Sequence, residues 1–505
     1  PVMLAIAGIP VLVASIAALF GHFDLSFFSA VPQRVFGIMD NSLLVSVPLF
    51  VAMGILLERS QVAQRMLLTM AAFFGGSRAG LAYSVLIVSA LIAASTGIIG
   101  ATIVMLGMIS LPAMLKAGVS KHLSSGLICA SGTLGQIIPP SIVLILLGDQ
   151  ISNAYIEAQQ NAGNFAPDPV SVGDLFAGAI VPGGLLVLLY AGYIFLASRG
   201  TGEPDKNAGD RSQPPIVQSV SAVQVMSVFV PPLLLILAVL GSILAGVATA
   251  TEAAAIGVAG TLLIAAANSE RASLWLKSVV LLAAFSAFSL SALLGMGWSR
   301  IDFSSGSLVL DLGALAAIGF SALLLLGLVA SLWRLFCDGV LNSALRESVS
   351  ISGMVFAIII AASMLSLVFR GFEGEEMIEQ LLLAIPGDKW GALIAVMLVV
   401  FLLGFILEFV EIVFIVVPII GPVLLGMDFH PVWFALMLAI NLQTSFLTPP
   451  FGFALFYYRS VAPPSISSLD IYRAVIPFIA IQIVAMIMLA LFPSLVTWLP
   501  DTLAY

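Results

Sequence analysis

Residues 79–115 form a stretch of 37 residues without a single Asp, Glu, Lys or Arg. A helix that crosses the hydrocarbon core of a bilayer needs about 20 residues, so this stretch is too long for one crossing and too short for two crossings with a loop. Two short helices that meet at a tip inside the membrane fit its length. Ser95, Thr96 and Gly97 lie at its midpoint, where small and polar residues favour a turn. The stretch therefore predicts a re-entrant helical hairpin.

A second stretch, residues 390–427, repeats this pattern over 38 residues, and its only charged residues, Glu408 and Glu411, lie at its centre. A carboxylate at the middle of a bilayer costs about 2.5–3.5 kcal/mol on insertion scales, so it needs a partner or a function. Three interpretations of Glu408 are open: it ligates Na⁺, carries a proton, or hydrogen-bonds the tip of the hairpin. Glu411 either shares that function or caps the N-terminus of the returning helix.

The composition of the whole chain requires lipid as its solvent. Hydrophobic residues make up 61% of the 505 residues and charged residues only 9%, with a mean hydropathy of +1.17; a soluble globular chain carries about 25% charged residues. We expect an all-α polytopic membrane protein, because helices satisfy their own backbone hydrogen bonds in lipid. There is no basic patch for nucleic acid. Cys129 and Cys337 make neither a disulfide framework nor a four-ligand zinc site.

Apolar runs of spanning length predict further transmembrane helices around the two hairpins. The first run lacks a charged start and an evident cleavage site, so we interpret it as a transmembrane helix rather than a signal peptide. The predicted spans are residues 1–20, 41–57, 175–198, 224–246, 253–269, 278–299, 312–333, 348–369 and 474–500.

Each hairpin is followed by a span that a pair of prolines interrupts. Residues 123–148 contain Pro139-Pro140, and residues 429–458 contain Pro449-Pro450. Proline lacks an amide donor and clashes with the preceding turn, so two consecutive prolines break a helix. Freed backbone groups are tolerated at membrane depth only against protein or a wet cavity. The sequence therefore predicts two discontinuous helices.

The two hairpin units match each other at an offset of 310 residues, which aligns Pro139 with Pro449 and Ser131 with Asn441. With a cytoplasmic N-terminus and each hairpin returning to its own side, 14 of the 18 Lys and Arg residues are cytoplasmic and 4 are periplasmic. This bias obeys the positive-inside rule and gives the hairpins opposite orientations. It predicts an inverted-topology repeat in a bacterial inner membrane, with the C-terminus in the periplasm. The alternative is that the prolines merely kink two ordinary spans.

These features divide the chain into scaffold segments and hairpin segments. The expected division is N-terminal scaffold helices (1–78), first hairpin and interrupted helix (79–148), connecting and scaffold helices (149–274), a two-helix insertion (275–345), a second scaffold helix (346–389), second hairpin and interrupted helix (390–458) and a C-terminal helix (459–505). Transporters with such repeats bind their cargo where the broken elements face each other at the middle of the membrane.

The hairpin tips and helix breaks collect hydroxyl, amide and carboxylate side chains. Hard oxygen donors suit a dehydrated Na⁺, whereas soft transition metals prefer thiolates or imidazoles. Carbonyl oxygens and helix C-termini add to a cation site, and helix N-termini suit the anionic group of a substrate. The candidate binding residues are Ser95, Thr96, Gly97, Ser131, Gly132, Thr133, Glu408, Glu411, Asn441, Gln443, Thr444, Ser445 and Thr448, with helix breaks at Pro139, Pro140, Pro449 and Pro450.

Several phrases in these regions resemble the large membrane subunit, or permease, of tripartite ATP-independent periplasmic (TRAP) transporters. The second half is similar to the subgroup labelled mannitol or chloroaromatic transporters. The similarity runs through about residues 41–268 and 345–490. The phrases include Pro48-Leu49-Phe50, Ala94-Ser95-Thr96-Gly97, Gly132-Thr133-Leu134-Gly135, Ile138-Pro139-Pro140-Ser141, Thr251-Glu252-Ala253-Ala254-Ala255-Ile256-Gly257 and Thr448-Pro449-Pro450-Phe451-Gly452.

The resemblance implies an elevator transporter of the ion-transporter superfamily. It implies that a Na⁺ gradient drives import of a small organic anion such as a C4-dicarboxylate, sialic acid or a keto acid, with no other cofactor. It also implies two partners, a small four-helix membrane subunit and a periplasmic solute-binding protein. The chain departs from the family in two places. The family usually has Asp where Glu408 stands, and residues 275–335 add two spans that either modify partner contacts or form a lipid-facing insertion.

Three alternative functions stay open. A self-sufficient Na⁺- or H⁺-coupled carboxylate carrier of related architecture would need no binding protein. An intramembrane enzyme would need a nucleophile with its base, or a set of metal ligands, at mid-depth. The three histidines, His22, His122 and His430, fall near predicted membrane ends instead. A membrane scaffold would not change solvent access with Na⁺. We therefore expect a transporter and not an enzyme.

Overall fold

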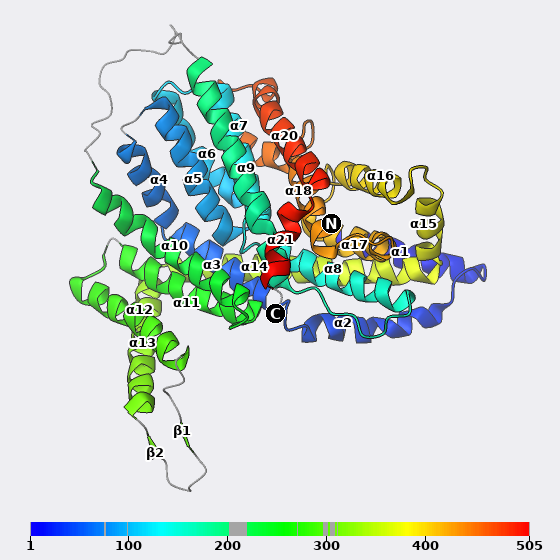
Figure 1. Ribbon diagram of the computed structural model, residues 1–505, viewed down its shortest axis with the longest axis horizontal. Helices are drawn as coiled ribbons and strands as arrows, with labels where there is room; N and C mark the ends of the chain where they lie inside the picture. Colours follow the sequence, from blue (N-terminus) through cyan, green and yellow to red (C-terminus); the bar gives the residue numbers. More distant parts are fainter. Residues whose placement is uncertain are drawn as a thin grey trace.

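The computed structural model describes residues 2–74, 77–97, 99–200, 220–269, 271–295, 301–302, 309–310 and 312–503. The described residues form helices almost throughout, and the exception is a pair of two-residue antiparallel strands (Figure 1). Nine of the described helices are long and apolar enough to cross a membrane, or ten if α3 and α4 together count as one bent span. The expectation of an all-α polytopic membrane protein is confirmed at this level.

The first half of the chain forms the N-terminal helices, the first repeat and the helices that follow it. They are α1 (Val2–Leu19), η1 (Leu25–Ala30), α2 (Val31–Asp40), α3 (Ser46–Arg59), α4 (Val62–Phe73), α5 (Arg78–Thr96), α6 (Ile99–Lys116), α7 (Lys121–Thr133), η2 (Leu134–Gln136), α8 (Ile142–Asn161), α9 (Val172–Gly200), α10 (Ala222–Leu244) and α11 (Ala250–Asn268).

The second half begins with two helices that extend away from the others in Figure 1, joined through the short strands. Its elements are α12 (Leu274–Gly295), β1 (Ile301–Asp302), β2 (Val309–Leu310), α13 (Leu312–Cys337), α14 (Val340–Gly371), α15 (Gly374–Leu383), α16 (Asp388–Leu403), α17 (Phe409–Gly426), α18 (Pro431–Leu447), α19 (Phe453–Val461), α20 (Ser468–Leu491) and α21 (Ser494–Leu503).

Both long stretches without basic residues consist of two helices each. α5 and α6 pack against each other and are separated at residues 97–98, where Gly97 has a φ of +60°. Glycine suits this turn because a left-handed backbone disfavours a Cβ atom. α16 and α17 likewise pack together and are separated by residues 404–408. Neither stretch is one straight rod, and the depth of the two turns in a bilayer stays a prediction.

The two proline pairs lie at breaks between helices. α7 ends at Thr133, a short 3₁₀ turn follows, and α8 begins at Ile142, after Pro139-Pro140. α18 ends at Leu447 and α19 begins at Phe453, after Pro449-Pro450. Both Pro-Pro peptide bonds are cis.

A sharp corner precedes each hairpin, at matching places in the two halves. α3 and α4 meet at 52°, and Gln61 at that corner has a φ of 59°. Glu373, 312 residues later, has a φ of 56° between α14 and α15. A residue other than glycine with positive φ is uncommon, so the same device at both corners supports the repeat.

One predicted span differs from the structure. The expected helix over residues 474–500 is divided into α20 and α21, because Pro493 lies between them and cannot continue the backbone ladder of α20. The other predicted spans overlap α1, α3 and α9 to α14, although α1 is not among the nine helices of spanning length. Residues 296–299 of the predicted span 278–299 lie outside the described residues.

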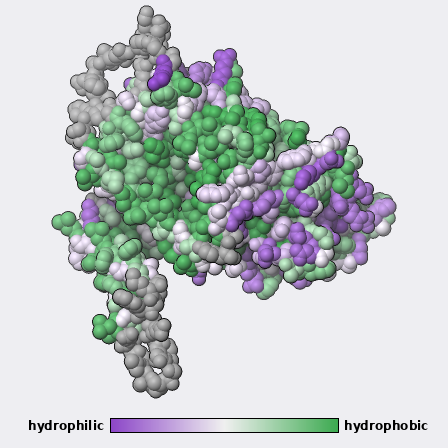
Figure 2. Space-filling view, viewed as in Figure 1, coloured by the Kyte–Doolittle hydropathy of each residue, from purple (hydrophilic) through white to green (hydrophobic). Residues whose placement is uncertain are grey.

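Apolar side chains cover much of the outer surface. Figure 2 shows a broad hydrophobic area over the body of the molecule and hydrophilic residues gathered toward one side. Large apolar side chains such as Leu188 (71% exposed) and Phe288 (76% exposed) point outward from their helices. Lipid is the solvent that suits such a surface. Of the two cysteines, Cys129 is buried and Cys337 is exposed.

Candidate functional site

The two broken helices touch each other at equivalent residues. The side-chain Nε2 of Gln443 on α18 donates to Oγ1 of Thr133 at the end of α7, at 3.3 Å. The two residues are 310 apart, which is the offset that aligns the two repeats. Both side chains are fully buried. The Thr133 hydroxyl in turn donates to the carbonyl of Ala130 at 2.8 Å.

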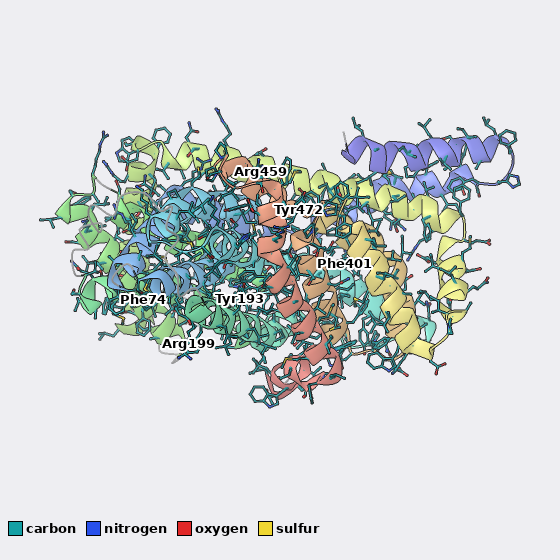
Figure 3. All side chains as sticks on the ribbon, turned by 90° about the horizontal axis from the view of Figure 1, so that it is seen from above. Phe74, Tyr193, Arg199, Phe401, Arg459 and Tyr472 are labelled. Carbon is teal, nitrogen blue, oxygen red and sulfur yellow. The ribbon has the colours of Figure 1, made fainter. Side chains whose placement is uncertain are left out.

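Two predicted residues of the second repeat attach α18 to the first arm of its hairpin. Asn441 Nδ2 donates to the Met397 carbonyl at 2.7 Å, and Ser445 Oγ donates to the Phe401 carbonyl at 2.6 Å. Each pair of partners is four residues apart, so one face of α18 is fastened to one face of α16. Phe401 is labelled in Figure 3.

Two more hydroxyls, on Thr444 in α18 and on Thr448 directly after it, bond to carbonyl groups of the preceding turn. Thr444 Oγ1 donates to the Ile440 carbonyl and Thr448 Oγ1 donates to the Thr444 carbonyl, both at 2.7 Å. Such bonds to the preceding turn satisfy the donor of a buried hydroxyl and leave its lone pairs available.

The two predicted glutamates lie at the start of α17. Glu408 is the N-cap residue, and its backbone amide donates to Oε2 of Glu411 at 3.1 Å. Glu411, only 6% exposed, therefore has the capping role that its position allowed. Glu408 is half-buried at the positive end of α17.

Tyr457 of α19 brings the two hairpin turns together, and the sequence analysis did not single it out. It lies close enough to Glu408 to interact electrostatically. A Cβ atom on Gly100, near the start of α6, would lie 2.7 Å from the ring carbon Cζ of Tyr457. An aromatic residue seven positions after the second proline pair was the available signal.

α20 contacts the second proline pair, and α19 is bonded to the segment that connects it to α20. The Tyr472 hydroxyl donates to the Pro450 carbonyl at 3.3 Å, and Arg459 donates to the carbonyl of Ile466. Figure 3 shows Tyr472 and Arg459 near the same end of α20.

In the first repeat the predicted site residues have different structural roles. Ser131 is fully buried and its hydroxyl has no partner in the described part of the chain. Gly132 is a packing position, because a Cβ there would lie 2.2 Å from Cγ1 of Ile103 on α6. Ser95 and Thr96 form the last residues of α5, and their side chains lie outside the described part. Gly97 closes that helix, and a Cβ atom added there would lie 3.2 Å from the backbone nitrogen of Ile142, the first residue of α8.

One buried polar residue in the break was missed. Gln136 is the last residue of η2 and is fully buried, and within the described ranges neither of its amide atoms has a hydrogen-bond partner. It is the only amide side chain among residues 123–148, and this was the signal that could have found it. Ser141 Oγ donates to its backbone carbonyl at 3.1 Å.

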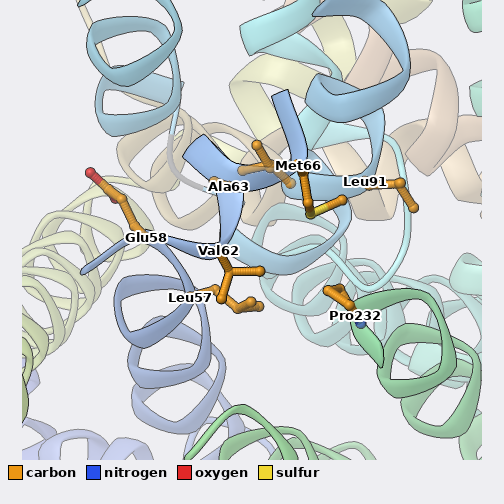
Figure 4. A pocket seen from close by; sticks show the side chains of 8 residues that line it. Leu57, Glu58, Val62, Ala63, Met66, Leu91 and Pro232 are labelled. Atoms are coloured by element: carbon orange, nitrogen blue, oxygen red, sulfur yellow. The ribbon is translucent and has the colours of Figure 1, made fainter. Parts of the chain in front are cut away.

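Two cavities lie away from this crossing. The first, about 10 Å³ and large enough for one water molecule, lies beneath the corner of α3 and α4 beside Glu58 (Figure 4). The second, about 450 Å³, lies between α8, the start of α9 and the α10–α11 connection. Its wall includes Asp149, which accepts hydrogen bonds from Asn41 at 3.0 Å and Gln150 at 2.9 Å. No predicted site residue lines either cavity.

The crossing therefore presents neutral oxygen atoms, with Glu408 and Glu411 at the nearby tip. The described residues contain no group of three or more His, Cys, Asp or Glu side chains that could hold a metal ion. Hydroxyl, amide and carbonyl oxygens fit a hard monovalent cation better than a transition metal.

Known proteins are similar to this chain over nearly all of its length. The C4-dicarboxylate TRAP transporter large permease protein of Vibrio cholerae is 25% identical over 502 residues, which cover 99% of this chain and 95% of that protein. The ectoine TRAP transporter large permease protein of Halomonas elongata is 25% identical, covering 98% of this chain and 94% of its own. The sialic acid TRAP transporter large permease protein of Vibrio cholerae is 23% identical, covering 93% and 88%.

A solved structure shares the fold. The YdaH transporter of Alcanivorax borkumensis superposes with a TM-score of 0.58 at 12% identity, covering 99% of both chains. The relatives are named as transporter permeases, which confirms the expectation that this chain is not an enzyme.

The family match covers both repeats and both sets of scaffold helices. The family described as the DctM component of tripartite ATP-independent periplasmic transporters matches residues 2–294 and 310–495. α13 and nearly all of α12 fall inside these matched segments, and the role of residues 275–335 stays a prediction. The chain is a multi-pass membrane protein that belongs to the DctM family, the large permease component of bacterial TRAP transporters.

Proposed function

We propose that this permease imports a small organic anion of the carboxylate class together with Na⁺, by an elevator mechanism. The observation that carries the proposal is the hydrogen bond between Gln443 and Thr133, which places the two helix breaks against each other at equivalent residues. Broken helices that face each other in an inverted repeat are the sites at which secondary transporters bind ions and substrates.

Na⁺ is supported by the donors at this crossing. Thr133, Thr444 and Thr448 all donate their hydroxyl protons to carbonyl groups, so their lone pairs remain for a cation. The ends of α7 and α18 add the partial negative charge of helix C-termini. Glu408 supplies a full negative charge at the tip of the second hairpin.

The substrate class is supported by the relatives. Their names include C4-dicarboxylate and sialic acid transporters. In our proposal the anionic group of the substrate binds near the N-termini of α17 and α6, where the helix dipoles favour negative charge. A small four-helix membrane subunit and a periplasmic solute-binding protein complete the system. The bacterial inner membrane holds the complex, with the N-terminus of this chain in the cytoplasm.

Uptake into liposomes tests the proposal. The chain is reconstituted with and without its small subunit and binding protein, and uptake of radiolabelled succinate and N-acetylneuraminate is measured under an inward Na⁺ gradient or an equal K⁺ gradient. We expect uptake of one of these carboxylates that requires Na⁺ and both partners. Equal uptake in Na⁺ and K⁺ would contradict Na⁺ coupling, and full uptake by this chain alone would establish a self-sufficient carrier instead.

A further inference from the structure

Three basic side chains gather where α7, α19 and α20 meet, and we call them the basic corner. Lys121 at the start of α7 donates from Nζ to the carbonyl of Ser465 at 3.1 Å, and Arg459 of α19 donates to the carbonyl of Ile466 (Figure 3). Arg473 lies in the second turn of α20. All three are exposed, and within the described residues none of them forms a salt bridge.

One carboxylate lies near the basic corner, and it already has partners. Asp470 accepts hydrogen bonds from the backbone amide and the hydroxyl of Ser467, at 2.9 and 2.7 Å, and so caps the start of α20. Lys121 and His122 lie close enough to Asp470 to interact with it electrostatically. Three permanent positive charges therefore face one negative charge, and the corner keeps a net positive charge.

The other repeat has the same helix cap without the cations. α9 begins with a serine that bonds an aspartate three residues later, as α20 does. Counted from this cap, or by the offset of 310 residues, the positions that correspond to the basic corner are Ala177, Pro431 and Asp149. The fold can therefore be built without these cations. They occur only on the side that the distribution of Lys and Arg predicts to be cytoplasmic.

Arg473 lies on the exposed face of α20, within a row of apolar side chains. Leu469 one turn before it is 55% exposed, and Ile476 one turn after it is 57% exposed. The same exposed face continues toward the C-terminus of α20 through Ile483, Ile487 and Leu491. The opposite face packs on α7, α9 and α18. A guanidinium above a row of aliphatic side chains matches a phospholipid, which joins an anionic headgroup to acyl chains.

We propose that the basic corner and the exposed face of α20 together bind an anionic phospholipid. The phosphate group binds Arg473 and the remaining donors of Lys121 and Arg459, and an acyl chain lies along α20. A lysine has three N–H donors and an arginine five, so the bonds to Ser465 and Ile466 leave donors available. Basic sites between transmembrane helices on the cytoplasmic side bind anionic headgroups in this way. The inference goes beyond the proposed transport of an anion and does not depend on it.

Thermal denaturation of the full-length protein in detergent tests this inference. Dioleoylphosphatidylglycerol is compared with dioleoylphosphatidylcholine, which has the same acyl chains and no net charge. Inorganic phosphate supplies the anion without acyl chains. A ligand that binds only the folded state raises the melting temperature. We expect phosphatidylglycerol to give a clearly larger rise than phosphatidylcholine, and inorganic phosphate at the same concentrations to give none.

Two variants and a matched control locate the site. Arg473→Gln should increase the phosphatidylglycerol concentration for the half-maximal rise about fivefold, the usual effect of one cation near a membrane surface. Arg473→Lys keeps the charge and should lose much less. Arg346→Gln is the control, because Arg346 is also exposed near the start of its helix, α14, and forms no salt bridge within the described residues. This change should leave the response to phosphatidylglycerol unaltered.

Four outcomes would overturn the inference. Equal rises with the two phospholipids would show that the headgroup is not recognised. Equal losses for Arg473→Gln and Arg346→Gln would show a general attraction to surface charge. A full rise with inorganic phosphate would make the corner a site for soluble anions. Loss of the phosphatidylglycerol effect when the small membrane subunit is bound would assign this face to that protein. Na⁺-dependent uptake is measured separately, so the proposed function stands or falls independently of these results.

Discussion

Gln443 donates a hydrogen bond to Thr133, the residue at the equivalent position in the other repeat. In a twofold arrangement a residue meets its counterpart only close to the symmetry axis, as at the centre of a symmetric dimer interface. Under the predicted inverted repeat, the bond would mark where the pseudo-twofold axis of the two repeats passes through the protein. Any ion or substrate bound near this point is held by both halves at once.

Removing this contact should weaken Na⁺ binding. Thr133→Val keeps the shape of the side chain and removes the acceptor of Gln443, so the Na⁺ concentration for half-maximal uptake should rise several-fold. Stability should fall by about 1 kcal/mol, the usual contribution of a buried hydrogen bond. Thr261→Val is the matched control, because its buried hydroxyl bonds the Gly257 carbonyl within α11, away from the crossing. Equal Na⁺ requirements for the two variants would remove Thr133 from the ion site.

The two glutamates at the tip should separate into different roles. Glu408→Gln is expected to abolish most Na⁺-dependent uptake at normal expression, because it removes the negative charge at the tip of the second hairpin. Glu411→Ala removes the oxygen that accepts from the Glu408 amide, so it should lower the stability by about 0.5–2 kcal/mol through loss of the cap on α17 and reduce uptake less. Uptake assays and thermal denaturation of both variants decide this, and identical profiles would argue against the division.

An ion pair fastens the outer part of α8 to the end of α14. Arg370 Nη2 lies 2.6 Å from Oε1 of Glu157 on α8, and its Nε donates to Glu375 on α15. Both carboxylates are 35% exposed, so they are matched except for the helix that carries them. With spin labels at positions 160 and 377 in a cysteine-free background, Glu157→Gln should lengthen or broaden the distance distribution. Glu375→Gln should leave it unchanged, and similar distributions for both would show that the pair does not restrain α8.

The packing of α7 on α20 allows no side chain at Gly126. An added Cβ would lie 2.1 Å from the backbone carbonyl oxygen of Ala474. Gly126→Ala should therefore destabilise the protein strongly, by about 3 kcal/mol or more, because backbone and not a flexible side chain has to move. Gly192→Ala in α9 is the control, since the added atom meets nothing within 4 Å. Helix propensity makes that change neutral or stabilising by up to about 1 kcal/mol, and melting temperatures compare the two.

His430 should make stability depend on pH. Burial lowers the pKa of this imidazole, although the carboxylates of Asp501, at 3.8 Å, and Asp174 oppose the effect. A histidine whose pKa is lowered on folding binds its proton more weakly in the folded state, so stability is lost as the pH falls below about 6.5. His430→Gln should lose less stability between pH 7 and pH 5 than the wild type. His22→Gln, at an exposed position, is the control, and an unchanged slope for His430→Gln would contradict this assignment.

The main architecture could be read from the sequence because its determinants are local. The lack of charge over residues 79–115 and the proline pair at 139–140 act through length and backbone chemistry, which no tertiary contact can override. Pro493 also acts through local backbone chemistry, but the sequence analysis overlooked it. It separates α20 from α21. These features depend on composition along a single segment.

The partners of the site residues could not be read in this way. Asn441 and Ser445 were expected to be free for an ion, yet their donors are used to fasten α18 to α16, which depends on how two helices are rotated against each other. Gly132 was likewise expected to bind at the helix break and is instead a packing position against Ile103 of α6. Gln136 was missed because only the fold shows that its amide is buried and has no partner among the described residues.

The unequal exposure of the two cysteines gives the molecule a natural attachment point. A thiol reagent added to the folded protein reaches Cys337 at the end of α13 and is kept from Cys129 inside α7. A fluorophore can therefore be coupled to one known position of the unaltered chain. Movement of the rest of the protein relative to α13 can then be followed in single molecules without removing any native residue.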